Sequence, residues 1–258
     1  MQWRTTEDPA VFAAHVLPFL AQSPVGNTIL LTEINFLLRH RAPGSAQLYG
    51  WAETDPGEVV GAFLRGPGHP TLLTEMPTDA FSALSHDLAA GSLGVPASLA
   101  ADACARWDLA VRQRFTIWRA ERVRESSGHG VRAATEADLA LLHQWFDDFR
   151  ASHPEDPSDR HFVIDDPLAD HGILLAVEDG TPRAMASRSP VIAGMTRLGL
   201  AWPPDRTDLV DRAVDALLAE SGGRVSHVVV LTPHQGPDAT RWRDRGFAPV
   251  AQRALLAP

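Results

Sequence analysis

Lysine is missing from this 258-residue sequence, so all 23 basic residues are arginines. Every ion pair or phosphate contact must therefore use a guanidinium, whose planar fork binds oxyanions in a bidentate way. Cysteine is nearly absent as well, because Cys104 is the only one. A disulfide within the chain is excluded, which fits a reducing cytosol. Cys104 lies in an alanine-rich stretch, where we expect a small packing residue and not a nucleophile.

Long apolar runs are absent too. No stretch reaches membrane length, and the first ten residues are polar and charged, so we expect a soluble cytoplasmic protein without a membrane partner. The net charge of −9 disfavours general nucleic-acid binding, although a local arginine patch is compatible with it. The eleven histidines are scattered, without H-x-x-E-H or C-x-x-C spacing, and we therefore expect no catalytic metal.

The length suits two domains of about 120 to 130 residues each. The polar segment 125–130 contains two glycines and is the best candidate for a linker, so the predicted domains are residues 1–125 and 131–258. The first half repeats loosely in the second, which suggests an internal structural duplication. Its pattern predicts helices at 9–22, 27–40, 78–90 and 96–107, and strands at 47–53, 58–64, 71–74 and 112–123.

Residues 194–218 carry the clearest functional pattern. A strand ends at Pro203 and Pro204, neither of which can donate to a sheet ladder, and an amphipathic helix follows with Leu209 and Ala213 on its apolar face. A strand, a tight turn and a helix that opens toward the strand end commonly form an anion-binding site. We therefore take this stretch as the centre of the predicted active site.

The remainder of the second half predicts one sheet with flanking helices. Thr135 and Asp138 form a capping-box-like start to a helix with an apolar stripe. The last strand begins with the phrase R-G-F-A-P-V at residues 245–250. Strands are predicted at 172–178, 183–189, 193–202, 226–232 and 247–255, and a short helix at 237–245.

The central stretch, the helix that starts at Thr135 and the G-F-A-P-V ending together resemble the GNAT (GCN5-related N-acetyltransferase) family. The resemblance covers most of the C-terminal half. It implies an α/β (α+β) fold with two tandem GNAT-like domains, each a mixed, mostly antiparallel sheet flanked by helices, with the N-terminal domain degenerate. It also implies that the strands splay apart at the active site of the C-terminal domain.

In the GNAT family, a Q/R-x-x-G-x-G/A loop holds the pyrophosphate of acetyl-CoA at the start of this helix. The corresponding loop here is Asp205-Arg206-Thr207-Asp208, which has neither glycine. Glycine lets the backbone approach a phosphate closely, and Asp205, Asp208 and Asp211 would repel one. No cofactor is therefore certain, and acyl-CoA remains an alternative held by Arg206 and Thr207.

The resemblance also places the acyl-transfer residues. In the family, backbone N–H groups in the gap between two strands bind the donor carbonyl, and a tyrosine on the last helix releases the leaving group. The tyrosine position falls on Trp242, whose indole is no useful acid near neutral pH, and His234 is the nearest titratable replacement. The catalytic candidates are His234, Ser187 and Thr232, and the donor-binding candidates are Leu200, Ala201, Trp202, Arg206, Thr207 and Trp242. A surface histidine at 234 and a structural hydrogen bond at 187 are the alternatives.

An irregular, acid-rich segment spans residues 152–167, where GNAT folds bind the acceptor. Its carboxylates favour a cationic or amine-bearing small molecule. The acceptor-binding candidates are His153, Glu155, Asp156 and Arg160, together with Arg188 on the middle strand. A solvated surface loop is the alternative interpretation.

The changed cofactor loop and the missing tyrosine favour an N-acyltransferase with an unusual donor, namely an aminoacyl-tRNA, which some GNAT-fold proteins use. Arg112, Arg114, Arg122 and Arg124 would share one face of a strand and are the candidate RNA contacts. The first alternative is an N-acetyltransferase that depends on acetyl-CoA or another acyl-CoA, and the second is a non-catalytic GNAT-fold ligand-binding module. The acceptor and the oligomeric state are not predicted.

Overall fold

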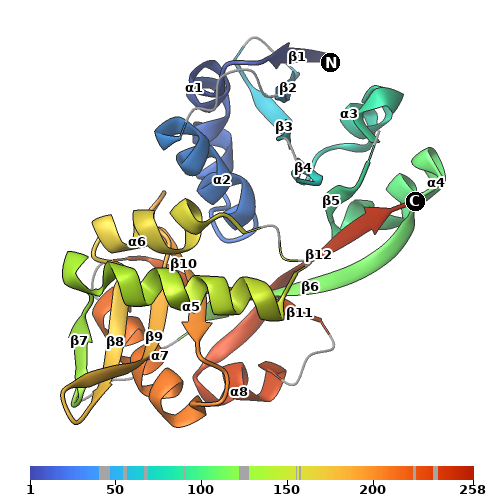
Figure 1. Cartoon of the computed structure of the whole chain (residues 1–258). Coiled ribbons are helices and arrows are strands. Elements are labelled where there is room, and N and C mark those ends of the chain that lie inside the picture. The colour runs from blue at the N-terminus through green and yellow to red at the C-terminus, as the bar shows by residue number, and fades with distance from the viewer. Residues whose placement is uncertain are drawn as a thin grey trace. The chain divides into compact units, whose positions relative to one another are not determined.

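The computed structural model describes residues 1–40, 47–54, 57–66, 69–89, 91–121, 128–154, 156, 158–222, 225–234 and 238–258. These residues form two compact units (Figure 1). Unit 1 contains Met1–Ile117, Thr232–Ala239 and Pro249–Pro258, and unit 2 contains Trp118–Leu231 and Thr240–Ala248. The predicted linker at 125–130 lies partly outside the described residues, so the domain ranges 1–125 and 131–258 stay a prediction.

Unit 1 begins with a short strand and a pair of helices. Asp8 caps the first helix by accepting a hydrogen bond from the Ala10 N–H at 2.8 Å, and Pro9 occupies the first helical turn, where its missing N–H costs nothing. The elements are β1 (Gln2–Thr6), α1 (Pro9–Leu20), α2 (Thr28–Arg39), β2 (Leu48–Glu53), β3 (Val59–Arg65), β4 (Thr71–Leu73), α3 (Thr78–Ser82), β5 (Leu93–Pro96), α4 (Ala100–Trp107) and β6 (Ala110–Ala120). Short 3₁₀ helices lie at His86–Ala89 and Ala97–Leu99.

Unit 2 repeats this order of elements. Its first helix starts at the predicted capping box, because Thr135 and Asp138 exchange the expected side-chain and backbone hydrogen bonds; that prediction is confirmed. The elements from residue 131 onward are β7 (Val131–Ala133), α5 (Leu139–Ser152), α6 (Asp166–Ala169), β8 (Ile173–Glu178), β9 (Thr181–Arg188), β10 (Met195–Trp202), α7 (Thr207–Gly222), β11 (His227–Pro233), α8 (Asp238–Asp244) and β12 (Phe247–Ala257). The end of β11, the start of α8 and β12 from Pro249 onward belong to unit 1. A 3₁₀ turn lies at Glu136–Asp138 and a π-helical turn at His161–Asp165.

The strand pairings of the two units correspond one to one. In unit 1, β1–β2, β2–β3 and β3–β4 are antiparallel and β4–β5 is parallel. In unit 2, β7–β8, β8–β9 and β9–β10 are antiparallel and β10–β11 is parallel. Both units therefore have the mixed, mostly antiparallel sheet that was predicted, and the same topology occurs twice in the chain.

Four segments differ from the sequence-based expectation. The predicted helix 78–90 ends at Ser82, and a separate 3₁₀ helix at His86–Ala89 follows it. β1 was missed, because five mostly polar residues give no apolar signal before pairing with β2. The predicted helix 96–107 begins four residues later, at Ala100, because Leu93–Pro96 forms the buried strand β5 and a 3₁₀ turn follows it. The segment 152–167 was predicted to be irregular, but its second part forms the π turn and α6.

Apolar side chains cover the sheet of unit 2 on both faces. Leu142 and Phe146 of α5 pack against Ile173 and Leu175 of β8 on one face. The helix α7 packs against β8 and β9 on the other face (Figure 1). The sheet thus fixes the C-terminal end of β10 beside the start of α7. Within the described residues, no helix combines the length and apolar character needed to cross a membrane.

Candidate functional site

The parallel pair β10–β11 opens partway along its length. The ladder joins Met195 to His227, Thr196 to Val228 and Arg197 to Val229. In unit 2, β10 continues to Trp202 and β11 continues to Leu231. No further pairing joins the described residues of these two strands. Backbone N–H and C=O groups beyond Arg197 therefore lack the partners that a continued ladder would give them.

A β-bulge lies on β10 at the same point. Against β9, Leu198 pairs with Arg188 and Ala201 with Ala186, so Gly199 and Leu200 of β10 face the single residue Ser187 of β9. The hydroxyl of Ser187 holds the extra residue, because its Oγ accepts from the Leu200 N–H at 2.9 Å and donates to the Leu200 carbonyl at 3.3 Å. A side chain at Gly199 would approach this Oγ to 2.7 Å.

The bulge changes the roles expected for two predicted site residues. The Leu200 N–H turns toward β9 to bind Ser187, and Trp202 pairs with Met185 of β9. Because successive N–H groups of a strand point to opposite edges, the Ala201 N–H is the candidate backbone donor for an acyl carbonyl on the open side. Ser187 itself is buried and engaged with the backbone. The structure thus places it where it shapes the strand, which is the structural alternative considered from the sequence.

Three aromatic side chains gather at the end of β10. Trp202 lies edge-on to Phe149 at 5.9 Å and to His153 at 6.3 Å between ring centroids. His153 stacks on Phe149 at 4.8 Å, and its Nδ1 lies 3.2 Å from the Phe149 carbonyl oxygen. A predicted donor-binding residue and a predicted acceptor-binding residue are therefore neighbours. Phe149 was predicted only as part of the apolar stripe of its helix, since nothing in the sequence links it to residue 202.

The turn between β10 and α7 differs from a glycine-rich phosphate loop. Pro203 and Pro204 offer no N–H donor, and the Thr207 hydroxyl donates to the Pro204 carbonyl at 3.4 Å. Arg206 lies 3.7 Å from the carboxylate of Glu178, and both side chains are about half exposed. A pair so exposed contributes little energy, so Arg206 can exchange this carboxylate for another anion.

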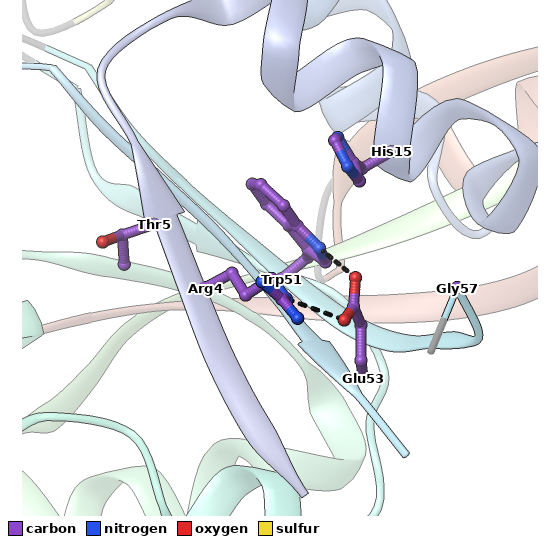
Figure 2. A pocket seen from close by; sticks show the side chains of 6 residues that line it. All are labelled: Arg4, Thr5, His15, Trp51, Glu53 and Gly57. Carbon is purple, nitrogen blue, oxygen red and sulfur yellow. Dashed lines mark hydrogen bonds and ion pairs between the residues drawn. The ribbon is translucent and has the colours of Figure 1, made fainter. Parts of the chain in front are cut away.

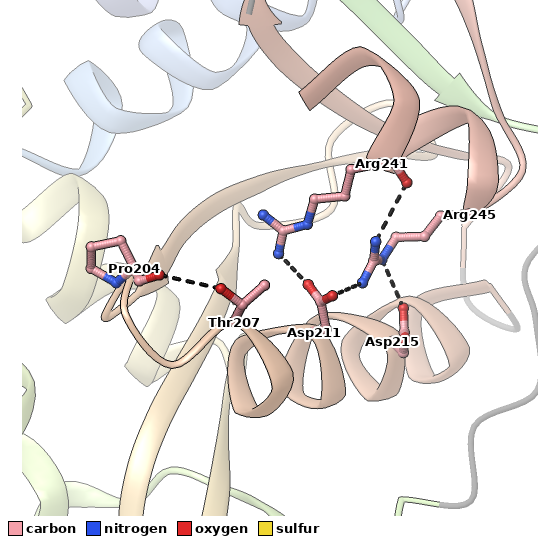
Figure 3. A network of polar contacts seen from close by, with 6 residues as sticks. All are labelled: Pro204, Thr207, Asp211, Asp215, Arg241 and Arg245. Atoms are coloured by element: carbon pink, nitrogen blue, oxygen red, sulfur yellow. Dashed lines mark hydrogen bonds and ion pairs between the residues drawn. The ribbon is translucent and has the colours of Figure 1, made fainter. Parts of the chain in front are cut away.

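The acids of α7 are partly neutralised by α8. Figure 3 shows Asp211 between Arg241 and Arg245, with Asp215 also bound by Arg245. The Arg245 contacts are 2.8 Å to Asp211 and 3.0 Å to Asp215. Asp211 lies beyond the first turn of α7 and is ion-paired, which reduces the repulsion expected of it; that expectation stays a prediction. Asp205 and Asp208 are exposed at the helix start.

This network fixes α8, which carries Trp242. The indole is buried and lies 5.1 Å from the ring of Phe247, nearly perpendicular to it. The guanidinium of Arg241 lies over the same indole at 5.9 Å. In the described structure Trp242 is therefore a packing residue at the position where the resemblance expects a proton donor.

The predicted acceptor residues fall into different environments. Asp156 accepts a hydrogen bond from the Ser158 N–H at 2.8 Å, and Arg160 lies 3.8 Å from Asp165. Arg188 is buried: its Nη1 makes one long hydrogen bond of 3.4 Å to the Ser189 carbonyl, and its Nε has no partner among the described residues. Glu155 lies outside the described residues.

His234 belongs to unit 1, where it meets two of the predicted RNA-binding arginines. Its Nδ1 lies 2.9 Å from the Thr116 hydroxyl, and its backbone N–H donates to the Arg114 carbonyl at 2.8 Å. His234, Arg112 and Arg114 line a cavity of about 330 Å³. Thr232 is buried in the same unit. Arg122 and Arg124 lie outside the described residues.

A larger cavity of about 470 Å³ lies elsewhere in unit 1 (Figure 2). Its polar groups already bind one another, because Glu53 accepts from the Trp51 indole and the Arg4 guanidinium, each at 2.8 Å. These two hydrogen bonds, led by that of Trp51, lower the pKa of Glu53. His15 stacks on Trp51 at 4.4 Å. This cavity is larger than the one beside His234, but its satisfied polar groups suit it less well for catalysis.

Metal binding has no support in this part of the chain. Among the described residues, no group of three or more histidine, cysteine, aspartate or glutamate side chains is arranged to hold a metal ion.

No protein-family model and no curated protein matches the sequence. Solved structures match its fold over nearly the full length. A GCN5-related N-acetyltransferase from Sphaerobacter thermophilus has a TM-score of 0.62 at 13% identity and covers 99% of this chain and 95% of its own. A tandem GNAT protein from the clavulanic acid biosynthesis pathway has a TM-score of 0.58 at 11% identity, with coverages of 100% and 98%.

The chain has the GNAT fold. A GNAT-family acetyltransferase from Colwellia psychrerythraea agrees, with a TM-score of 0.60 at 10% identity and coverages of 100% and 99%. The predicted recognition is thus confirmed for the fold, and the match to a tandem GNAT protein agrees with the repeated pairing of unit 1 and unit 2. At such low identity, the likeness says nothing about the donor or the acceptor. Which donor and which acceptor the protein uses depends on the residues of the site.

Proposed function

We propose that this GNAT-fold protein is an acyl-CoA-dependent N-acyltransferase, which forms an amide on an amine-bearing small molecule at the end of β10 in unit 2. The observation that carries the proposal is the coincidence of the open β10–β11 ladder with the bulge at Gly199 and Leu200. An opened parallel pair presents backbone N–H groups in fixed positions, which is what a developing oxyanion needs. Solved GNAT acetyltransferases with the same fold support this reading.

The residues fit the acyl end of such a donor better than its diphosphate. The N–H group of Ala201 would polarise the thioester carbonyl. The amine nitrogen forms the new bond to the carbonyl carbon, the carbon–sulfur bond breaks, and the thiolate takes up the proton that the nitrogen loses. Pro203 and Pro204 remove N–H donors from the turn, so a side chain would assist the start of α7 in holding the diphosphate. We assign that role to Arg206, because its weak, exposed pair with Glu178 leaves the guanidinium exchangeable.

His153 and Trp202 form the proposed acceptor side of the site. The imidazole lies on the aromatic pair Phe149 and Trp202 and is exposed, so it can meet an incoming ammonium group and take its proton. Asp156, on the segment that follows, supplies a negative charge that attracts a cation. Arg188 would face a carboxylate of the acceptor, since its buried guanidinium has no carboxylate partner among the described residues.

Calorimetry with acetyl-CoA, followed by a transfer assay over a panel of amines, tests the proposal. We expect saturable binding, and we expect Arg206→Gln to weaken it about three- to tenfold because one charge-assisted contact is lost. Arg183→Gln is the matched control, since Arg183 is an exposed arginine on β9 outside the site. Absence of acetyl-CoA binding at millimolar concentration would contradict the proposal. Binding without transfer would favour the ligand-binding module.

One observation favours a second candidate, an aminoacyl-tRNA as the acyl donor. Arg112 and Arg114 are exposed beside His234 and form no ion pair with any described residue. Two free guanidinium groups at a cavity suit a phosphate backbone. We expect RNA binding that weakens steeply with salt, and a shallower salt slope for the double variant Arg112→Gln, Arg114→Gln. No binding of tRNA at low salt removes this candidate.

A further inference from the structure

A second cavity of unit 1 has a buried arginine in its wall. It measures about 290 Å³ and is lined by the turn between α1 and α2, by the segments that follow β4 and β5, and by β12. Arg253 of β12 is 4% exposed, and its Nη2 donates to the carbonyls of Leu73 at 2.8 Å and Gly94 at 2.9 Å. These bonds anchor the guanidinium at one end of the cavity.

The remaining donors of this guanidinium have no protein partner. Neither Nε nor Nη1 of Arg253 makes a hydrogen bond with a described residue, and no ion pair joins Arg253 to a carboxylate in that part of the chain. Burial lowers the pKa of Arg253 to about 10, so the group stays protonated at neutral pH. The charge of Glu75 opposes this shift, but Glu75 forms no ion pair with the guanidinium among the described residues, so an anion bound directly to the free donors would offset part of the cost of burying the charge.

The other walls indicate the kind of anion. Phe19 and Pro96 are apolar, and Asn27 is buried with only its amide nitrogen bonded, to the Leu20 carbonyl at 3.2 Å. The volume is at the small end for ligand pockets and holds an organic molecule of few atoms. Planar, bidentate recognition by a guanidinium favours a carboxylate.

We propose that unit 1 contains a binding site for a small aliphatic carboxylate, which Arg253 holds through Nε and Nη1 while Phe19 and Pro96 contact its apolar part. The site lies apart from the residues assigned to acyl transfer and does not depend on the proposed function. Glu75 also lines the cavity, where its carboxylate accepts from the Ser98 hydroxyl at 2.6 Å. Its negative charge limits the affinity for an anion.

The test compares carboxylates with their neutral amides on the full chain without an acyl donor. Acetate, propionate and butyrate are titrated by calorimetry at constant ionic strength, beside acetamide, propionamide and butyramide. We expect saturable binding of at least one acid at millimolar concentration or below, and none for its amide. Equal responses to acid and amide, or no binding of any acid, overturn the proposal.

Three variants locate the site. Arg253→Met should abolish binding, with circular dichroism as the folding control. Because that variant removes a buried group, Ser23→Phe provides an independent test: Ser23 is exposed at the cavity wall, and a ring there should weaken binding about tenfold or more. Glu75→Gln should tighten binding roughly two- to fivefold by removing a like charge. Unchanged affinity in Ser23→Phe and Glu75→Gln contradicts the proposed location.

Discussion

The parallel strand pairs β4–β5 and β10–β11 occupy the same place in the two units but end differently. The β4–β5 ladder joins Thr71 to Leu93 and Leu72 to Gly94, and at its end the Arg253 guanidinium binds the carbonyls of Gly94 and of Leu73, the next residue of β4. The β10–β11 ladder ends at Arg197 and Val229, where β10 bulges. In unit 1, a side chain of the protein thus binds strand carbonyls at the end of the ladder.

The comparison shows why one topology can serve two purposes. Where parallel strands part, their backbone groups need partners from outside the ladder. In unit 1, Arg253 supplies donors to the strand carbonyls. In unit 2 the bulge turns the backbone of β10, and a substrate can become the partner. We therefore assign acyl transfer to unit 2.

The strongest test of this contrast replaces one glycine beside each parallel ladder. Gly199→Val places a side chain against the Ser187 Oγ, which a Cβ would approach to 2.7 Å, and should distort the bulge. We expect a loss of about 1–3 kcal/mol in the free energy of unfolding and at least about a tenfold loss of transfer activity. Differential scanning calorimetry and a transfer assay measure the two effects.

The matched control is Gly94→Ala in unit 1. Its Cβ would lie 2.7 Å from a methyl group of Leu72, so it should lower stability. Transfer by the folded protein should stay unchanged. Equal losses of activity in the two glycine variants would mean that the open ladder of unit 2 has no special role.

Ser187→Ala sharpens the comparison by asking what the bulge requires. Removing the hydroxyl leaves the Leu200 N–H without its partner, and we expect a destabilisation of about 1–2 kcal/mol. Activity should fall through a raised KM, while the pH profile of kcat keeps its shape. Ser152→Ala, on the exposed end of α5, is the control. A fully stable Ser187→Ala protein without any transfer activity would instead identify Ser187 as catalytic.

A third prediction concerns Asp138, at the start of the helical segment before α5. Asp138 binds Arg132 through two hydrogen bonds of 2.6 and 2.8 Å, and this pairing lowers the pKa of Asp138 from 3.8 to about 2. A carboxylate with a lowered pKa stabilises the fold above its unfolded pKa. That contribution is lost as the pH falls from near 3.8 through about 2.

Asp138→Asn should therefore lower the free energy of unfolding by about 1 kcal/mol at neutral pH. The loss is modest because Arg132 is partly exposed, so that solvent screens the ion pair. Urea unfolding at pH 7 and pH 2 measures the difference, which should shrink at the lower pH. Asp147→Asn, an exposed acid on α5, serves as the control and should change stability little at either pH.

The smallest expected effect is at the aromatic group of unit 2. His153→Leu keeps an apolar contact with Phe149 and Trp202 but removes the imidazole. We expect the KM for the amine to rise about threefold. The rise should be largest at pH values at which the amine arrives protonated, because a base must then take its proton. Steady-state kinetics across pH measure this, and an unchanged KM at every pH excludes His153 from the acceptor site.

Local patterns in the sequence were enough to predict the elements around β10 and α7. The double proline ends a strand, the spacing of Leu209 and Ala213 predicts the helix, and the Thr135–Asp138 box predicts the start of the helical segment before α5. The strand β5 was missed because four apolar residues beside alanine-rich segments do not distinguish a strand from a helix. The bulge was missed too, since its signal is one exposed glycine opposite a serine.

Contacts between distant residues could not be predicted in the same way. Arg253 binds Leu73 and Gly94, which are 180 and 159 positions away in the sequence. His234 meets Thr116 across 118 positions. These contacts depend on which strand β12 and β11 join, and pairing of strands from opposite ends of a chain leaves no local pattern. The candidate carboxylate site is therefore visible only in the folded protein.

The pairing of β12 with β5 has a consequence for biosynthesis. Residues 253–256 complete the sheet of unit 1 by binding residues 93–96, so a ribosome must release nearly the whole chain before that sheet acquires its last neighbour. During translation, the sheet of unit 1 therefore has an unpaired strand edge, which a chaperone can cover. The sheet is completed only after the residues of unit 2 have been synthesised.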